Sequence, residues 1–97
     1  MYYVLKHKET GEIFSCSQKN IYDFIYHGVK SWEDEDTAAS EMASVLAEQG
    51  YDEPEQWEVF DLEEEHTLKM CNVKLANNPA KRLYMREDGR LETRSHT

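Results

Sequence analysis

The chain opens with an apolar run that has the composition of a β-strand. Tyr3, Val4 and Leu5 are followed by a polar stretch, 9–12, that contains a glycine, and the apolar pattern returns over 13–16. β-branched and aromatic residues on both sides of a glycine-containing turn are typical of a hairpin. We therefore predict that the chain begins with two paired strands.

A short helix is predicted after this hairpin. Ile21, Phe24 and Ile25 stand at positions i, i+3 and i+4, the spacing that places side chains on one face of a helix. Ser17 can cap the start of such a helix, and Gly28 stands where a glycine would end it. The prediction is a helix of about two to three turns between these two residues.

A longer helix is predicted over 37–49. Four apolar residues form a stripe along it, and Gly50 follows as a stop. The members of the stripe are Ala39, Met42, Val45 and Leu46. Acidic residues over 33–36 precede the helix, where negative charge meets the positive end of the helix dipole.

A core-facing strand is predicted over 57–62, because Trp57 and Phe60 alternate there with further apolar residues. The next segment, 68–75, fits either a strand with one change of phase or a short helix, and we favour the helix. Its helical face would carry Leu68, Cys71 and Leu75.

A second hairpin is predicted at the end of the chain. Residues 83–86 and 90–93 flank Asp88 and Gly89, a pair that suits a tight type I′ turn. The elements together predict one small α+β domain over 1–97, with a small antiparallel sheet and two or three helices. The predicted order is β-hairpin, helix, helix, strand and C-terminal hairpin, with a frayed tail over 94–97.

Composition is compatible with a small folded domain. Charged residues make up 32% of the 97 residues, but two tryptophans, six tyrosines and three phenylalanines supply the large side chains that a small core needs. Cys16 and Cys71 lack the spacing of a metal or redox site, so we expect buried free thiols, with a disulfide as the alternative. No apolar run approaches the roughly 18 residues that span a bilayer, so we expect neither signal peptide nor anchor.

Charge is distributed unevenly along the chain. Fourteen acidic residues and no lysine or arginine lie between Glu33 and Glu65, a segment that we call the acidic block. All eleven lysines and arginines lie outside it, and the formal net charge is −9. A concentrated negative field repels nucleic acids and anionic membranes and attracts basic protein surfaces, so the block bears on partners more than on fold.

No metal or cofactor site is predicted. A calcium loop that started at Asp34 would need glycine at its sixth position and glutamate at its twelfth, where the chain has Ala39 and Val45. The four histidines show no i, i+3 or i, i+4 pairing with one another or with a cysteine, so the spacing of a zinc site is absent.

An enzyme is not expected either. The sequence has no GxSxG elbow and no glycine-rich phosphate loop. Glu64, Glu65 and His66 could pair an acid with an imidazole, but adjacent side chains usually point in different directions, and a solvated strand end explains them better.

Direct binding of nucleic acid is opposed by the net charge of −9. The C-terminal portion nevertheless combines Tyr84 with five basic residues that could meet phosphates. These basic residues are Lys81, Arg82, Arg86, Arg90 and Arg94. We favour the alternative that they keep the sheet edge soluble or pair internally with acids.

The acidic block is instead predicted to bind a protein partner. Solvated helix and strand faces are commonly charged, but crowding one sign of charge destabilises a fold through repulsion, so solubility alone explains the block poorly. Glu41 and Glu48 lie two helical turns apart, about 10 Å. Folded together with the acids over 33–36 and those of the following loop and strand, they could present rows of carboxylates that resemble the display of charge on a duplex backbone. The predicted partner-binding residues are Glu33, Asp34, Glu35, Asp36, Glu41, Glu48, Asp52, Glu53, Glu55, Glu63, Glu64 and Glu65.

In size, acidity, mixed α/β pattern and lack of catalytic motifs, the chain resembles phage- and prophage-encoded anti-CRISPR proteins. The resemblance is to the type I-F inhibitors that act as DNA mimics, and it lies in overall character and in the acidic block. It implies a non-enzymatic inhibitor in the cytoplasm of a bacterial host cell. The acids would occupy the basic groove of a Cas subunit of a type I surveillance complex and exclude target DNA.

A different hypothesis stays open. The acids could serve solubility alone, while a regulatory or structural accessory protein acts through an apolar interface, such as a homodimer formed by Tyr22 and Tyr26. We favour a monomer in the absence of such an interface. Salt separates the two hypotheses, because a contact steered by charge weakens with ionic strength and an apolar contact does not.

Overall fold

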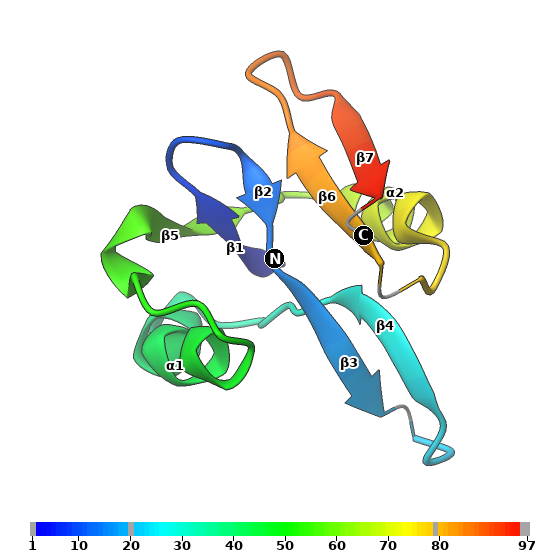
Figure 1. Cartoon of the computed structure of the whole chain (residues 1–97), viewed down its shortest axis with the longest axis horizontal. Coiled ribbons are helices and arrows are strands. Elements are labelled where there is room, and N and C mark those ends of the chain that lie inside the picture. Colours follow the sequence, from blue (N-terminus) through cyan, green and yellow to red (C-terminus); the bar gives the residue numbers. More distant parts are fainter. Residues whose placement is uncertain (1, 20, 79, 96–97) are drawn as a thin grey trace.

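The computed structural model describes residues 2–19, 21–78 and 80–95 (Figure 1). Its elements are, in chain order, β1 (Tyr3–His7), β2 (Glu12–Ile13), β3 (Ser15–Lys19), β4 (Ile25–Val29), α1 (Glu35–Glu48), a 3-10 turn η1 (Pro54–Gln56), β5 (Trp57–Asp61), α2 (Glu65–Leu75), β6 (Lys81–Met85) and β7 (Leu91–Ser95). The predicted α+β class is confirmed.

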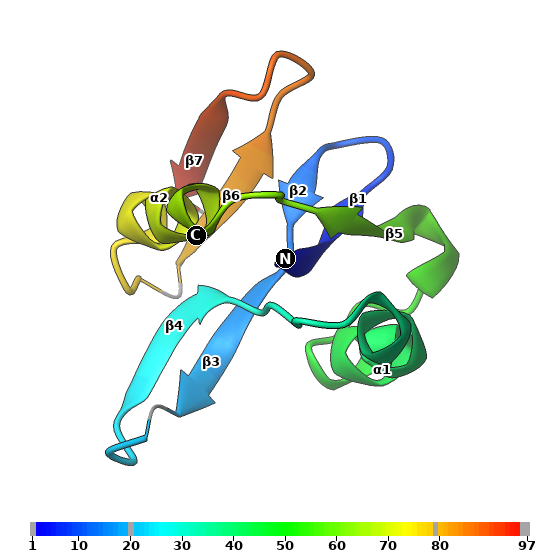
Figure 2. The same ribbon diagram turned by 180° about the vertical axis from the view of Figure 1, so that it is seen from behind.

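The strands form two antiparallel sheets. The larger has five strands in the order β5-β1-β2-β6-β7, and the smaller is a ribbon of β3 and β4. In the larger sheet Leu5 is paired with Val59 on one side of β1, and Lys6 with Ile13 on the other. The chain passes from the larger sheet into the ribbon at Phe14, which lies between β2 and β3 (Figures 1 and 2).

Both faces of β1 are buried, which explains why its sequence is apolar without alternation. Val4 belongs to a core cluster that contains Cys71 and Leu75 of α2. Leu5, its neighbour, belongs to a second cluster that contains Ala38 and Leu46 of α1. Successive residues of a strand point to opposite faces, so β1 connects the two halves of the core.

The helix predicted between Ser17 and Gly28 is wrong. The segment forms the β3–β4 ribbon, with Ser17 paired to His27, and Asp23 at its turn has a φ of 67°, outside the right-handed helical region. Ile21, Phe24 and Ile25, the expected helical face, are exposed at 91%, 70% and 68%. Helical spacing of apolar residues stabilises a helix only where that face packs against a core. Here the face is exposed, and pairing between β3 and β4 determines the conformation.

Helix α1 confirms the element predicted over 37–49, with two corrections. It begins at Glu35, where Asp34 is the N-cap, and Gln49 is its C-cap. Ala38 is buried and Ala39 is exposed, so the apolar stripe contains the former residue and not the latter. The stripe continues through Met42 and Val45 to the fully buried Leu46.

The ambiguous segment 68–75 is helical, as favoured, and lies within α2. Cys71 and Leu75 are fully buried and Leu68 packs against the same cluster, so the predicted helical face is confirmed. The expected free thiols are also confirmed, because Cys16 and Cys71 are buried and unpaired with each other. Burial raises the pKa of the Cys71 thiol to about 11, so it stays protonated at neutral pH.

Two asparagines, Asn72 of α2 and Asn77 just after this helix, hold the ribbon. The backbone N–H of Val29 donates to Asn72 Oδ1 at 2.9 Å, and that of His27 donates to Asn77 Oδ1 at 2.6 Å. Gly28 lies between them, and a Cβ atom there would be 2.9 Å from Asn72 Oδ1. The outer edge of β4 is therefore covered by side chains.

The C-terminal hairpin is confirmed, but its turn is not type I′. The N–H of Gly89 donates to Arg86 O and the N–H of Arg86 to Arg90 O, and Gly89 has a φ of 87°. A type I′ turn needs positive φ at both central residues, and Asp88 is not among the residues with positive φ. The turn is thus a three-residue loop with glycine in the left-handed position.

The expected frayed tail is wrong for Arg94 and Ser95, which belong to β7. His96 and Thr97 lie outside the described residues. Pairing of Arg82 with Arg94 and of Lys81 with Ser95 holds the end of β7 in the sheet.

Trp57 lies at the centre of the α1 side of the core. It is 3% exposed, and its ring makes edge contacts with Phe14 and Tyr51 at centroid distances of 6.1 and 5.3 Å. Phe60 points to the other face and is partly buried, with Lys6 Nζ 4.5 Å from its ring centroid. Core membership is confirmed in full for Trp57 and in part for Phe60.

Replacing Trp57 by alanine should lower the free energy of unfolding by about 3–5 kcal/mol, because loss of this buried ring leaves a cavity next to Phe14 and Tyr51. Phe60→Ala should lower it by about 1–2 kcal/mol, since this ring is already partly solvated. Urea unfolding of both variants measures the difference. Equal losses would contradict the assignment of the two rings to unequal environments.

Replacing Asn72 by alanine should lower the free energy of unfolding by about 1–3 kcal/mol, because the buried N–H of Val29 would lose its acceptor. Asn72→Asp keeps an acceptor oxygen at this position and is the matched control. Urea unfolding and amide exchange at Val29 measure the effect. Unchanged protection of the Val29 amide in Asn72→Ala would show that α2 does not hold the ribbon through this bond.

Candidate acidic interface

The acidic block is almost entirely at the surface. All of its fourteen acids are exposed except Asp61, which is half-buried. They lie at the start of α1, on α1, around η1, on the edge strand β5 and at the start of α2. Because β5 is next to β1, and α1 packs on both strands, most of these elements lie on one side of the molecule (Figures 1 and 2).

Two distant parts of the block meet beside Tyr3. The N–H of Tyr3 donates to Trp32 O at 2.8 Å and the N–H of Trp32 donates to Tyr3 O at 2.9 Å. Tyr3 is also paired with Asp61 at the end of β5. The segment that follows Trp32 therefore starts close to the end of β5, although 28 positions separate Glu33 from Asp61 in the numbering.

Tyr3 lies within the electrostatic influence of acids from both segments. Desolvation, and then the negative charges of Asp61, Glu35 and Asp34, raise the pKa of the Tyr3 hydroxyl. We name these three acids the Tyr3 cluster. An anion near a phenol disfavours the ionised phenolate, so a raised pKa is the expected effect of nearby carboxylates.

Two further acids are attached to the Tyr3 cluster. Trp32 Nε1 donates to Glu41 Oε2 at 3.2 Å, which places Glu41 of α1 against the residue bridged to Tyr3. The N–H of Glu63 donates to Asp61 Oδ1 at 2.7 Å, so Glu63 follows Asp61 closely. Glu63 has a φ of 67°, and this conformation redirects the chain from β5 toward α2.

Asp34 also has a local role as the N-cap of α1. Its Oδ2 accepts from the N–H of Thr37 at 2.9 Å and from Thr37 Oγ1 at 2.8 Å. These two hydrogen bonds lower the pKa of Asp34. Glu35 and Asp36 follow in the first turn, where carboxylates interact favourably with the helix dipole.

The remaining predicted site residues are not brought to the Tyr3 cluster. Asp52 and Glu53 line an open cavity of about 220 Å³ near His7 and Trp57, at the opposite end of β5. Glu48 lines a groove of about 280 Å³ beside β3, and its neighbours there include Lys19.

Three others lie in η1 and at the start of α2. Glu55 lies in η1, Glu64 is the N-cap of α2, and Glu65 begins that helix. The sequence suggested a single compact acidic surface. The structure has instead a cluster at one end of β5 and separate acids elsewhere.

Neutralising cations are scarce around the block. Among the ion pairs of the described residues, one includes a member of the block, Glu65 with Lys69 at 3.9 Å, and both side chains are exposed. Within the described chain, the Tyr3 cluster is joined to no lysine or arginine. Its charge is therefore open to a partner.

The basic residues of the C-terminal hairpin pair with acids outside the block. Arg82 lies 3.2 Å from Glu12, and Arg86 lies 3.0 Å from Glu92. Arg90 pairs with Asp88, and Arg94 pairs with Glu92 and lies over the ring of Tyr84. Internal pairing, the favoured alternative, is confirmed for these four arginines.

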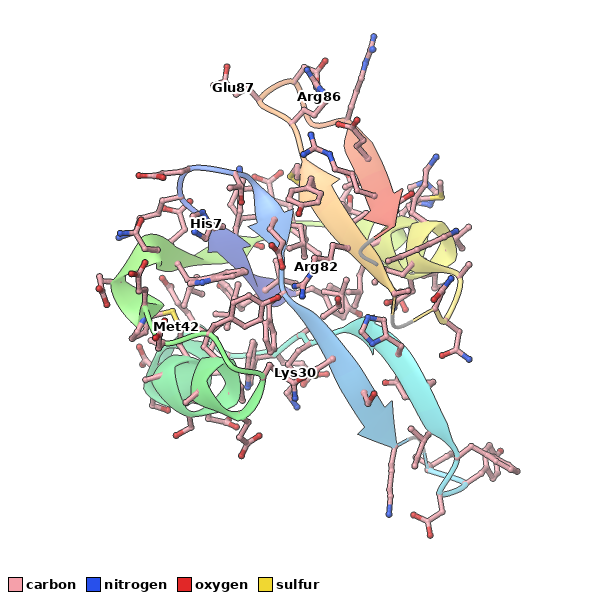
Figure 3. All side chains as sticks on the ribbon, in the orientation of Figure 1. His7, Lys30, Met42, Arg82, Arg86 and Glu87 are labelled. Atoms are coloured by element: carbon pink, nitrogen blue, oxygen red, sulfur yellow. The ribbon has the colours of Figure 1, made fainter. Side chains whose placement is uncertain are left out.

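An open cavity of about 510 Å³ lies between the β1–β2 turn and the β6–β7 hairpin. Arg86 and Glu87 extend from the hairpin beside it (Figure 3). Lysines 6 and 8 and two arginines line it together with four acids, so it has no excess of either charge. This balance does not favour an anionic or a cationic ligand.

A serine and a histidine lie close together between β3 and β4. Ser15 Oγ is 3.2 Å from His27 Nε2. His27 Nδ1 is buried, and within the described chain it has no hydrogen-bond partner, whereas a Ser-His-Asp site has a carboxylate at that nitrogen. Desolvation and then the charge of Arg82 lower the pKa of His27.

The described residues contain no group of three or more His, Cys, Asp or Glu side chains that could hold a metal ion. Neither helix in this part of the chain is long and apolar enough to cross a membrane.

One surface was missed from the sequence. The tip of the β3–β4 ribbon exposes Ile21, Tyr22, Phe24 and Ile25. The first, third and fourth were assigned to a helical face, and Tyr22 was named only in the alternative hypothesis. Asp23, a residue type that tolerates the left-handed conformation, was the signal for a turn at this position.

Comparison of the chain with protein-family models, with curated proteins and with solved structures found no match.

Replacing Asp34 by alanine should lower the melting temperature by about 5 °C at neutral pH, because α1 loses its N-cap. The folded-state pKa of Asp34 is lowered, so its contribution is complete well above the ordinary value of 3.8. The contribution is lost as the pH falls through the lowered folded-state pKa. Thermal unfolding of both proteins between neutral pH and pH ~2 measures this.

The matched control is Asp36→Ala, which removes the same charge from the first turn and leaves the cap in place. Equal melting temperatures for the two variants at neutral pH would show that Asp34 acts as a charge alone.

Proposed function

We propose that the protein is a non-enzymatic inhibitor, or decoy, whose acidic surface occupies the basic nucleic-acid groove of a partner. The observation that supports this best is the Tyr3 cluster. The segment that follows Trp32 and the end of β5, two separate acidic parts of the block, both lie beside Tyr3, and the ion pairs of the described chain include none of Asp34, Glu35 and Asp61.

Crowding of carboxylates without cations is unfavourable for the fold itself. Like charges at close range destabilise a fold, and a cation from the chain itself would relieve the repulsion. Eleven lysines and arginines exist elsewhere in the chain, yet none lies within the block. An arrangement of this kind is useful where the compensating charge belongs to another molecule.

A nucleic-acid groove is the basic surface that fits this description. Such grooves are lined by lysine and arginine, which bind phosphates and displace the counterions condensed on the nucleic acid. Carboxylates held on a folded surface can take the place of phosphates, and charge of this density accelerates association with a basic partner. The resemblance to anti-CRISPR proteins makes Cas subunits of a type I surveillance complex the candidate partner.

A regulatory or structural accessory protein with an apolar interface is the second candidate function. The four exposed apolar side chains of the ribbon tip favour it, because they lie within five consecutive residues, 21–25, at the end of a projecting element. High salt should leave this kind of contact intact, whereas it should weaken a contact made by the acidic block.

The triple variant Glu33→Gln, Glu35→Gln, Asp36→Asn should weaken partner binding at least tenfold, about 1.4 kcal/mol, mainly through slower association. Asp34 is retained so that α1 keeps its cap. Binding to a type I surveillance complex, or to a basic protein captured from a host lysate at low salt, is measured by surface plasmon resonance.

The matched control is Glu9→Gln, Glu87→Gln, Asp88→Asn, which changes the net charge by the same amount with the same residue types outside the block. It should bind as the parent chain does. Equal association rates for the two variants would contradict a site at the start of α1. A shift of duplex DNA by the protein alone in a mobility assay would contradict the decoy mechanism itself.

A further inference from the structure

The β3–β4 ribbon projects from the body of the molecule and exposes apolar side chains at its tip (Figures 1 and 2). Ile21 is 91% exposed, Tyr22 73%, Phe24 70% and Ile25 68%. Four adjacent side chains of this size amount to on the order of 500 Å² of apolar surface. Isolated apolar residues are common on protein surfaces, but several large exposed ones within five consecutive residues at the end of a projecting element are typical of an interface.

The ribbon differs from the rest of the surface in charge. Its charged residues in the described part are Lys19 and Asp23, which form an ion pair at 3.8 Å. The acidic block lies on other elements, namely α1, η1, β5 and the start of α2. Two copies of a chain with a net charge of −9 repel each other, and the ribbon is a surface where they can meet with little repulsion.

The two edges of the ribbon are not equivalent. On β4, the outward N–H groups of His27 and Val29 are bound by Asn77 and Asn72. Antiparallel pairs alternate between hydrogen-bonded and non-bonded positions, and Ser17 is paired with His27. Ser17 is therefore at a non-bonded position, and its backbone groups point away from β4, to the open edge of β3.

The space beside that edge is a groove. It has a volume of about 280 Å³ and lies between β3 and the C-terminal end of α1. Phe14, Cys16 and Val45 contribute its apolar lining, and Lys30 lies between α1 and β3 (Figure 3). An added strand would find backbone partners on β3 and an apolar surface next to it.

We infer that the ribbon is a self-association element, in which β3 pairs antiparallel with β3 of a second copy across a two-fold axis. A strand that pairs with its own copy satisfies two-fold symmetry directly, and backbone hydrogen bonds supply part of the affinity. If Ser17 lies on the axis, Lys19 of one copy faces Ser15 of the other, so no like charges are opposed. The tip of each copy then extends along the groove of the other.

The size of the apolar surface sets the expected strength. Two tips would bury on the order of 1,000 Å² in total, at the lower end of specific protein interfaces. A weak dimer is the result, populated at micromolar concentrations and above. Raising the salt concentration reduces the repulsion between the acidic surfaces, so it should strengthen this dimer, whereas it should weaken a contact made by the acidic block.

Sedimentation velocity over protein concentrations from ~1 to ~500 μM tests the inference, in ~50 mM and ~500 mM NaCl. The parent chain should pass from monomer to dimer, with the midpoint at lower concentration in high salt. The variant Ile21→Ser, Phe24→Ser should weaken the dimer at least tenfold. Val73→Ser, on the exposed face of α2, removes an apolar side chain that is 67% exposed and is the matched control.

Ser17→Pro tests the backbone pairing separately. Proline removes one outward N–H and takes no hydrogen bond from the β3–β4 ladder, so the fold should persist, as circular dichroism can verify. The dimer should again weaken at least tenfold. Neutralising Glu33, Glu35 and Asp36 should leave the dimer intact or strengthen it, so failure of the proposed function would not alter this result.

Three outcomes would overturn the inference. The first is a monomer throughout the concentration range in both salts, and the second is a dimer that the tip variant and Ser17→Pro leave unchanged. The third is a chain that stays monomeric while its tip binds another protein or zwitterionic lipid vesicles, because the occupant of the ribbon would then be of a different kind.

Discussion

Burial of β1 on both faces is the constraint on which the rest of the structure depends. Val4 and Leu5 point in opposite directions, and each is fully buried in a different cluster. β5 pairs along one side of β1 and β2 along the other, so this strand is joined to both neighbouring strands and to the core clusters of both helices. A small domain has few apolar residues, and the apolar residues of β1 contribute to the core on both faces of the sheet.

The position of the acidic block follows from the same strand. Tyr3 begins β1 and is bridged to Trp32 on one side and paired with Asp61 on the other. Backbone pairing therefore brings together carboxylates that are far apart in the sequence, although these like charges repel each other. The core supplies the stability against which this repulsion acts, and the proposed partner gains a surface that needs no ordering when it binds.

Much of the fold could be predicted from local pattern. Helix α1, β5 and the C-terminal hairpin each had an apolar period together with a cap or a turn residue, which are local signals. The ribbon could not be predicted in this way, because Ile21, Phe24 and Ile25 have the spacing of a helical face. Their conformation is decided by non-local contacts, namely the pairing of residues 15–19 with 25–29 and the hydrogen bonds from Asn72 and Asn77. The negative charge of the candidate site was visible in the sequence. The separation of its acids into the Tyr3 cluster and isolated residues elsewhere was not. The Tyr3 cluster forms because Tyr3 pairs with both Trp32 and Asp61 at one end of β5. Asp52 and Glu53 lie at the other end of this strand.

The central claim is that the acidic block is a preformed part of the folded surface. Amide hydrogen exchange of the free protein, followed residue by residue, tests it most directly. The account predicts slow exchange for Tyr3 and Trp32, whose N–H groups bond to each other's carbonyls, and for the amides of α1 and β5. Rapid exchange throughout 33–65 in the free protein, with protection that appears only in a complex, would contradict the claim and indicate a segment that folds on binding.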